Sequence, residues 1–295
     1  MNFGRVLTAM VTPFDAQGEV DYTATSNLIE HLITNGTDAL VVAGTTGESP
    51  TLSTEEKLAL FSYTVQEVNG RIPVIAGAGS NNTRESVALS KEAAARGVDA
   101  IMLVTPYYNK PSQEGMYQHF STIAHEVDLP VMLYNVPGRT SCHLEPKTAI
   151  RLADEVDNIV AIKDASGDLD GIAEIIEQTR EDFHLYSGDD GFTLPILSIG
   201  GAGVVSVSSH IVGQDMQKMI QAFEAGDVRT AAQIHRSILP VCHAMFSAPS
   251  PTPLKAVLNM NGVYVGEVRL PLVPLTDEER RELIKKVQFQ MTWAS

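Results

Sequence analysis

Eight short apolar runs, most of them rich in β-branched residues, recur along the chain, and segments of helical periodicity fill most of the gaps between them. The runs cover residues 6–11, 39–43, 73–76, 100–104, 131–134, 159–162, 184–186 and 203–207. They are mostly continuous rather than alternating, which is typical of parallel strands covered on both faces. Eight strand-then-helix units of this size predict an α/β fold, the (β/α)8 TIM barrel. A doubly wound sheet is the alternative, although its usual dinucleotide fingerprint after the first strand is missing.

The expected helices begin at recognisable residues. Asp21 is a suitable N-cap, Ser53 and Glu56 have the spacing of a capping box, and Pro146 suits the first position of a helix. No further strand is expected beyond about residue 211, where helices are predicted over residues 214–225, 228–245, 252–260 and 276–291. The chain therefore divides into a barrel catalytic domain, residues 1–225, and a helical extension packed on it, residues 226–295.

Composition narrows the class of protein. With 44% hydrophobic residues among 295, the chain can bury a large core, and its net charge of −15 disfavours nucleic acid and anionic membrane surfaces as partners. No run approaches the ~20 apolar residues of a membrane span, and the N-terminus lacks the long apolar region of a signal peptide. Cys142 and Cys242 are too few for a disulfide framework, and the eight histidines show no metal-binding spacing. We therefore expect a cytoplasmic protein with no metal and no other cofactor.

Lys163 ends the sixth run, and Asp164 follows it at once. A lysine at the end of a buried strand lies where its charged form is disfavoured, so a neutral amine that attacks a carbonyl becomes accessible near neutral pH. The commoner fate of such a lysine is solvation or pairing with a carboxylate such as Asp164. In a barrel of this kind, however, chemistry takes place where strands end, and Lys163 is therefore the candidate Schiff-base nucleophile.

Polar residues also follow the other runs. They lie at residues 44–49, 105–109, 134–140, 187–190 and 206–209. Because the carboxyl ends of all eight strands meet at one mouth, a lysine, several hydroxyls and one arginine would converge there. Such a set can bind a keto acid, form an imine and move protons without a metal.

Each of these groups has a candidate role in the reaction and an alternative, purely structural role. The turn at residues 44–47 offers free N–H groups and the Thr45 and Thr46 hydroxyls to a small carboxylate, or it is a plain connection. Tyr134 can exchange protons during imine formation, or it is an amphipathic core residue. Arg139 can bind a second carboxylate through two parallel hydrogen bonds, although most arginines form ion pairs at the surface instead.

Three motifs together resemble those of the dihydrodipicolinate synthase (4-hydroxy-tetrahydrodipicolinate synthase) family, within the N-acetylneuraminate lyase superfamily of class I aldolases. They are Gly44-Thr45-Thr46-Gly47-Glu48, Tyr134-Asn135-Val136-Pro137-x-Arg139-Thr140 and the strand-end Lys163. The likeness extends from Val6 to the last helix and includes residues 104–115, 187–190 and 269–271.

The resemblance implies a lyase that condenses pyruvate with L-aspartate 4-semialdehyde, the committed step toward diaminopimelate and lysine. Lys163 would form the pyruvate imine, and a proton relay would comprise Tyr134, Thr45 and Tyr108, the last contributed across a dimer interface. The substrate-binding residues would be Thr45 and Thr46 for the pyruvate carboxylate, Arg139 and Gly188 for the semialdehyde, and Val205, whose carbonyl would lie near the lysine. Members are commonly homotetramers built from two tight dimers.

The resemblance also implies an effector pocket at the dimer interface, where Ser49, Asn81, Glu85 and Tyr107 match the residues of lysine-inhibited relatives. Where those relatives usually carry a histidine or glutamate, this chain has Thr54 and Lys57. Because a like charge at Lys57 would oppose a bound lysine ammonium, we expect weak or absent feedback inhibition.

Two other functions compete with this one. The nearer is another pyruvate-dependent aldolase of the superfamily that acts on a sugar acid, against which Arg139 argues because those relatives lack an arginine there. The more distant is a non-catalytic barrel that senses a small ligand, which predicts loss of the lysine or of the relay tyrosine. Both Lys163 and Tyr134 are present.

Overall fold

Eight parallel strands close into one barrel in the computed structural model of the chain, which describes residues 3–287. The strands are β1 (Val6–Ala9), β2 (Ala39–Val42), β3 (Val74–Gly77), β4 (Ala100–Val104), β5 (Val131–Asn135), β6 (Ile159–Asp164), β7 (His184–Ser187) and β8 (Gly203–Ser206). Strands adjacent in sequence pair throughout, and Leu7 of β1 pairs with Val205 of β8 to complete the ring. The predicted (β/α)8 barrel is confirmed, and the doubly wound alternative is wrong because such a sheet stays open.

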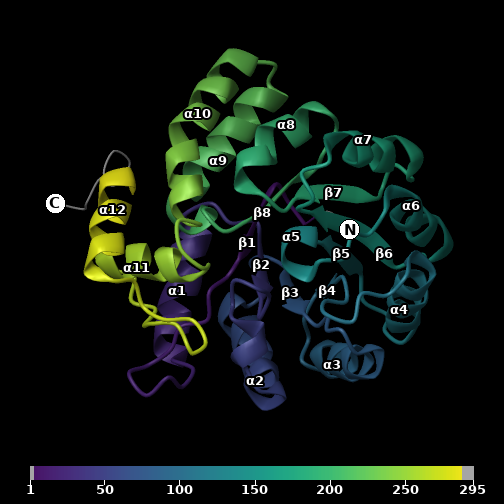
Figure 1. Cartoon of the computed structure of the whole chain (residues 1–295), viewed down its shortest axis with the longest axis horizontal. Coiled ribbons are helices and arrows are strands. Elements are labelled where there is room, and N and C mark those ends of the chain that lie inside the picture. The colour runs from purple at the N-terminus through teal and green to yellow at the C-terminus, as the bar shows by residue number, and fades with distance from the viewer. Residues whose placement is uncertain (1–2, 288–295) are drawn as a thin grey trace.

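Helices surround the strands, and the last three described helices gather on one side of the barrel (Figure 1). They are α1 (Tyr22–Thr34), α2 (Thr54–Val68), α3 (Thr83–Ala95), α4 (Gln113–His125), α5 (Pro137–Thr140), α6 (Pro146–Glu155), α7 (Leu169–Gln178), α8 (Thr193–Ser198), α9 (Ser209–Glu224), α10 (Val228–Ala244), α11 (Thr252–Met260) and α12 (Asp277–Val287). Short 3-10 turns, η1 (Ser49–Thr51) and η2 (Asp190–Phe192), follow the β2 and β7 loops. The predicted helical extension is confirmed as far as Val287, and residues 288–291 of its expected last helix lie outside the described residues.

The helix starts expected from Asp21, from the capping box of Ser53 and Glu56, and from Pro146 are confirmed. The Asp21 carboxylate accepts a hydrogen bond from the backbone N–H of Ala24 at 2.9 Å. Ser53 and Glu56 form a reciprocal capping box, with N···O distances of 2.7 and 3.1 Å. Each such cap satisfies helix N–H groups that have no partner within the helix, which fixes where the chain turns from loop into helix.

The helix expected to begin at residue 214 begins five residues earlier, at Ser209. The Ser206 hydroxyl accepts a hydrogen bond from the Ser209 N–H at 2.8 Å, so the first turn forms directly after β8. The backbone leaves helical geometry once, at Val212, where φ is −116°. This interruption explains why the helical pattern in the sequence becomes regular only beyond it.

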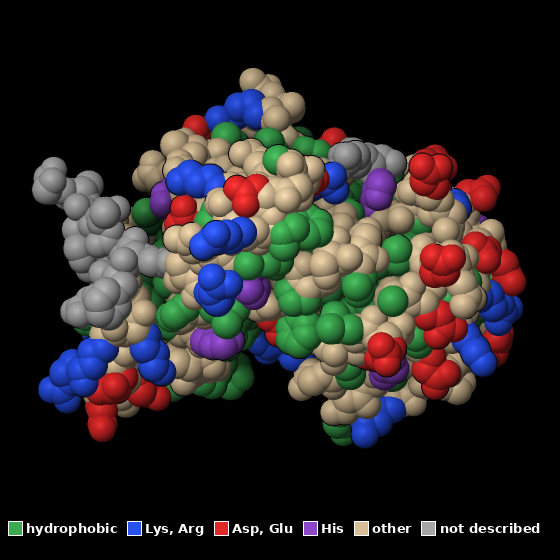
Figure 2. Space-filling view, turned by 90° about the horizontal axis from the view of Figure 1, so that it is seen from above, with side chains coloured by type: hydrophobic (Ala, Val, Ile, Leu, Met, Phe, Trp, Pro, Cys, Tyr) green, Lys and Arg blue, Asp and Glu red, His purple; other side chains and the backbone are tan. Residues whose placement is uncertain are grey.

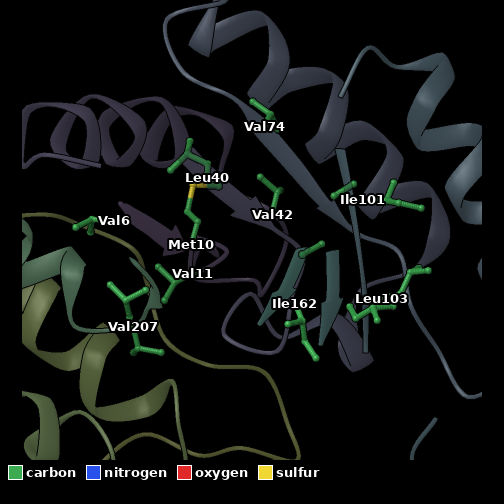
Figure 3. Close-up of a cluster of buried hydrophobic side chains, with 14 of the residues drawn as sticks. Val6, Met10, Val11, Leu40, Val42, Val74, Ile101, Leu103, Ile162 and Val207 are labelled. Carbon is green, nitrogen blue, oxygen red and sulfur yellow. The ribbon is translucent and has the colours of Figure 1, made fainter. Parts of the chain in front are cut away.

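Side chains of the strands fill two layers, because successive residues of a strand point to opposite faces. Ala39 and Val41 of β2 belong to the cluster inside the barrel, whereas Leu40 and Val42 belong to the larger cluster between the strands and the helices (Figure 3). Both layers are apolar, which is why the strand sequences are continuous apolar runs. Asp and Glu side chains gather at the right of the surface in Figure 2, in keeping with the acidic composition. Within residues 3–287, no helix has the length and apolar character needed to cross a membrane.

Candidate active site

The Lys163 side chain points into the barrel. Strand β6 continues through residues 163 and 164, so Lys163 shares the inward face with Ala161, a member of the inner cluster. Its side chain is buried, 4% exposed, and the ammonium nitrogen lies 4.1 Å from the centre of the Tyr134 ring. Among residues 3–287 it forms no ion pair. A buried lysine amine held only by an aromatic face is free to react with a carbonyl compound.

Asp164 does not pair with Lys163, because adjacent strand residues point to opposite faces. Its carboxylate accepts hydrogen bonds from the Asn135 amide at 2.8 Å and from the backbone N–H and hydroxyl of Ser166 at 2.8 and 2.5 Å. In the strand register Tyr134 lies opposite Lys163, and Asn135 lies opposite Asp164. The alternative that Asp164 neutralises the lysine is therefore wrong.

The turn after β2 presents unpaired N–H groups. Within the described residues, the backbone N–H groups of Thr45, Thr46 and Gly47 donate to no protein acceptor. The turn packs closely on β3, because a Cβ at Gly77 would lie 2.6 Å from the Ala43 carbonyl oxygen. Adjacent free N–H groups beside two threonine hydroxyls form a suitable site for a carboxylate.

A cavity of about 440 Å³ opens over the ends of β2 to β5. Its lining includes the predicted site residues Thr45, Tyr134 and Arg139, together with Thr140. The Lys163 side chain is not part of its wall, but the Tyr134 ring is, and that ring contacts the lysine nitrogen. The candidate nucleophile Lys163 therefore lies next to the part of the cavity wall that Tyr134 forms.

Gly188 adjoins the lysine strand, whereas Val205 lies on β8, and neither residue lines the cavity. The Gly188 N–H donates to the Asp164 carbonyl at 2.6 Å, and a Cβ at Gly188 would lie 2.8 Å from the Ala165 Cβ. Val205 is buried inside the barrel, in the cluster that contains Tyr134. The structure thus places Gly188 directly after β7, against the end of the lysine strand, and Val205 inside the barrel on β8.

The two adjacent tyrosines after β4 differ in environment. Tyr107 lines the cavity, whereas Tyr108 is 91% exposed, has a φ of +72° and is absent from the cavity wall. The Asn81 amide donates to the Tyr107 carbonyl at 3.1 Å, and Asn109 returns a hydrogen bond to the Asn81 carbonyl at 2.9 Å. These bonds tie the loop to the start of α3. In this arrangement the Tyr108 ring is exposed and does not line the cavity of its own subunit.

The outer part of the cavity contains the predicted effector residues Ser49 and Glu85, together with Thr54 and Lys57. Burial lowers the pKa of Lys57, and the nearby Glu85 carboxylate partly opposes that effect. Lys57 therefore already supplies a positive charge next to the Glu85 carboxylate in this part of the cavity. Asn81 is not part of the wall.

One contact that sequence reasoning missed joins the extension to the turn after β2. Lys255 of α11 and Glu48 form an ion pair at 2.7 Å, and both side chains are at most 2% exposed. The backbone N–H of Arg269 donates to the other Glu48 oxygen at 2.9 Å, and the Arg269 guanidinium pairs with Glu56. Burial lowers the pKa of Lys255, and the Glu48 carboxylate opposes that shift. No local sequence signal marks this pair, because its members are far apart along the chain.

Residues 3–287 contain no group of three or more His, Cys, Asp or Glu side chains arranged to hold a metal ion. The groups that meet at the strand ends are an amine, phenols, hydroxyls and a guanidinium. They are suited to covalent carbonyl chemistry and proton transfer.

The sequence and the fold of this chain are similar to those of several known proteins. The model of the dihydrodipicolinate synthetase family matches residues 2–290. The 4-hydroxy-tetrahydrodipicolinate synthase of Bacillus subtilis is 65% identical over 96% of this chain and 98% of its own length, and that of Listeria monocytogenes is 54% identical over 96% and 97%. The crystal structure of a dihydrodipicolinate synthase from Bacillus anthracis is 56% identical, covers 98% of each chain and superposes with a TM-score of 0.96. The enzyme from Cyanidioschyzon merolae, solved with lysine bound, is 48% identical over 97% of each chain, with a TM-score of 0.95.

Proposed function

Since the chain belongs to the dihydrodipicolinate synthetase family and condenses pyruvate with L-aspartate 4-semialdehyde to 4-hydroxy-tetrahydrodipicolinate, we propose that this lyase reaction proceeds through an imine on Lys163. The observation that carries the proposal is a buried lysine at a strand end that has no carboxylate partner within residues 3–287 and whose nitrogen lies against a tyrosine ring. The sugar-acid alternative has no support among the relatives named above.

The first half of the reaction uses the β2 turn and Lys163. The free N–H groups and hydroxyls of Thr45 and Thr46 hold the pyruvate carboxylate, which places the keto carbon by the amine. The amine adds to that carbon and water leaves, giving an imine; loss of a methyl proton then gives an enamine. Tyr134, whose ring contacts the lysine nitrogen, relays the protons together with Thr45.

The second half joins the enamine carbon to the aldehyde of the second substrate. Arg139 lines the cavity and binds the semialdehyde carboxylate. In this proposal Gly188 contacts the same substrate less directly, and Val205 offers its carbonyl to the lysine. The amine of the adduct then displaces Lys163 and closes the ring, so the lysine is regenerated and no redox cofactor takes part.

Tyr108 completes the relay from a second subunit. Its ring is 91% exposed and does not line its own cavity, so a role in proton transfer requires a neighbouring copy of the chain. The assembly is a homotetramer of two tight dimers in the cytoplasm.

Residues 1–225 form the catalytic domain, and residues 226–295 form the extension that supports it.

Lysine inhibits this enzyme weakly or not at all. The Lys57 cation lies in the outer part of the cavity beside Glu85, the acid on which an incoming ammonium would depend. Activity assays with increasing lysine should show little loss, and Lys57→Ala should increase the sensitivity. Strong inhibition of the unaltered enzyme at low lysine concentration would contradict this assignment.

Reduction with borohydride in the presence of pyruvate tests the mechanism. The expected result is a covalent adduct on the intact protein that peptide mapping assigns to Lys163, with no adduct on Lys163→Met. Lys57→Met, which removes another cavity lysine, serves as the control and should be trapped normally. An unaltered enzyme that turns over both substrates but is never trapped would overturn the mechanism.

A further inference from the structure

Strands β5 and β6 carry the two inward residues Tyr134 and Lys163, and their next residues form a second pair on the outward face. Asn135 and Asp164 lie opposite each other in the register. Both are buried, at 0% and 2% exposure, and the Asn135 amide donates to the Asp164 carboxylate at 2.8 Å. The catalytic contact and this hydrogen bond therefore join the same two strands from opposite sides.

The pair also reaches two neighbouring segments. The Asn135 side-chain oxygen Oδ1 accepts from the Leu144 N–H at 3.0 Å, which anchors the chain just after the helix that bears Arg139. The other oxygen of Asp164 accepts from Ser166, where the chain leaves β6. Four hydrogen bonds thus connect the lysine strand, the tyrosine strand and the arginine segment.

The backbone ladder between β5 and β6 does not by itself secure this arrangement. Its register shifts between Val131 and Met132, so the pairing at the beginning of the strands does not set the pairing at their catalytic ends. A shift of one residue would turn Lys163 to the outward face. A buried hydrogen bond at the last paired position excludes such a shift, because breaking it leaves polar groups buried without partners.

We propose that Asn135 and Asp164 are positioning residues that hold Lys163 against Tyr134 by locking the register of β5 and β6 at their carboxyl ends. The inference rests on the proposed imine function of Lys163 and adds to it two residues that touch no substrate.

Exchanging the two side chains provides the test. In Asp164→Asn the new amide NH2 group faces either the Asn135 NH2 group or the Ser166 donors, whichever way the side chain is turned. In Asn135→Asp two carboxylates face each other, so each single variant loses the donor–acceptor match. The double variant Asn135→Asp/Asp164→Asn restores one donor opposite one acceptor, and it keeps acceptors for the Leu144 and Ser166 N–H groups. The amide and carboxylate have nearly the same shape, so packing changes little.

The readout is the rate at which borohydride-trappable pyruvate imine forms in a single turnover. We expect each single variant to be slower by about tenfold or more, since small misplacements of a reacting group have effects of this size. The double variant should recover to within about threefold of the unaltered enzyme. If a single variant does not fold, the double variant alone decides.

Asn158→Asp is the matched control. Asn158 precedes β6 at its other end and donates to the carbonyls of Ala124, Val127 and Leu129. This variant should lower the melting temperature without slowing imine formation. Single variants that form imine at the normal rate, or a folded double variant as slow as the singles, would overturn the positioning role. Absence of any Lys163 adduct in the unaltered enzyme would instead overturn the proposed function.

Discussion

Lys255 and Glu48 form a buried ion pair between the helical extension and the turn that is proposed to hold pyruvate, with Nζ 2.7 Å from Oε1. The same lysine donates to the Glu267 carbonyl at 3.0 Å and lies 4.1 Å from the centre of the Phe14 ring. Both charged side chains are buried from water, so each needs the other as its partner. The helical extension therefore supports the turn after β2.

Removing one member of this pair should destabilise the protein strongly. Lys255→Met leaves the Glu48 carboxylate buried without its cation, and we expect a loss of about 3–5 kcal/mol in the free energy of unfolding measured in urea. Adding Glu48→Gln should recover most of that loss. Lys218→Met is the control: the Lys218 and Asp215 pair is 63% and 44% exposed, so the change should be below about 1 kcal/mol. Equal losses at both sites would contradict the assignment.

Arg139→Ala should impair use of the semialdehyde much more than use of pyruvate. Loss of a hydrogen-bonded charge on the substrate carboxylate is worth about 1.5–3 kcal/mol, or roughly tenfold to a hundredfold in kcat/KM for the semialdehyde. Trapping of the pyruvate imine should stay near normal, because the N–H groups that hold pyruvate belong to the β2 turn. Steady-state kinetics and borohydride trapping together check this, and an equal loss in both would disprove the role of Arg139.

Mixing two inactive variants should restore activity if Tyr108 acts across an interface. Tyr108→Phe keeps the lysine, and Lys163→Met keeps the tyrosine, so a hybrid dimer contains one complete site. We expect each variant alone to lose most of its turnover and the mixture, after subunit exchange, to regain a substantial part of it. A mixture no more active than its components, although exchange is shown by mass spectrometry, would place Tyr108 in the site of its own subunit or outside the relay.

Stability should fall as the pH drops from 6.5 toward 4, in part through His210. This imidazole is fully buried, its Nε2 accepts from the Val11 N–H at 3.3 Å, and burial lowers its pKa from 6.5 to about 4. The unfolded chain therefore takes up a proton below pH 6.5 that the folded protein excludes down to about pH 4. The stability that the neutral imidazole contributes is complete above pH 6.5 and is lost below it.

At pH 5 the expected loss from this group is about 2 kcal/mol relative to pH 7. Urea unfolding of the unaltered enzyme and of His210→Gln at the two pH values measures it. The variant should be less stable at pH 7 but should depend less on pH. An identical pH dependence in both proteins would show that His210 does not contribute.

The catalytic framework could be predicted from the sequence because its signals are local. Apolar runs mark the eight strands, caps such as Asp21 mark helix starts, and the position of Lys163 at the end of a run places it at the mouth of a barrel. Helix α9 begins five residues before the position that the apolar pattern predicts, because a serine hydroxyl satisfies the first N–H group of that helix.

Relations between distant residues were decided only by the tertiary structure. Arg269 and Glu48 are 221 positions apart, and nothing near either one in the sequence indicates that they meet. The direction of Asp164 away from the lysine, its bond to Asn135 and the different environments of Tyr107 and Tyr108 likewise depend on strand register and loop geometry. Periodicity and caps record how a residue interacts with its neighbours along the chain. Which buried charges and amides face one another is set by how the closed barrel brings its segments together.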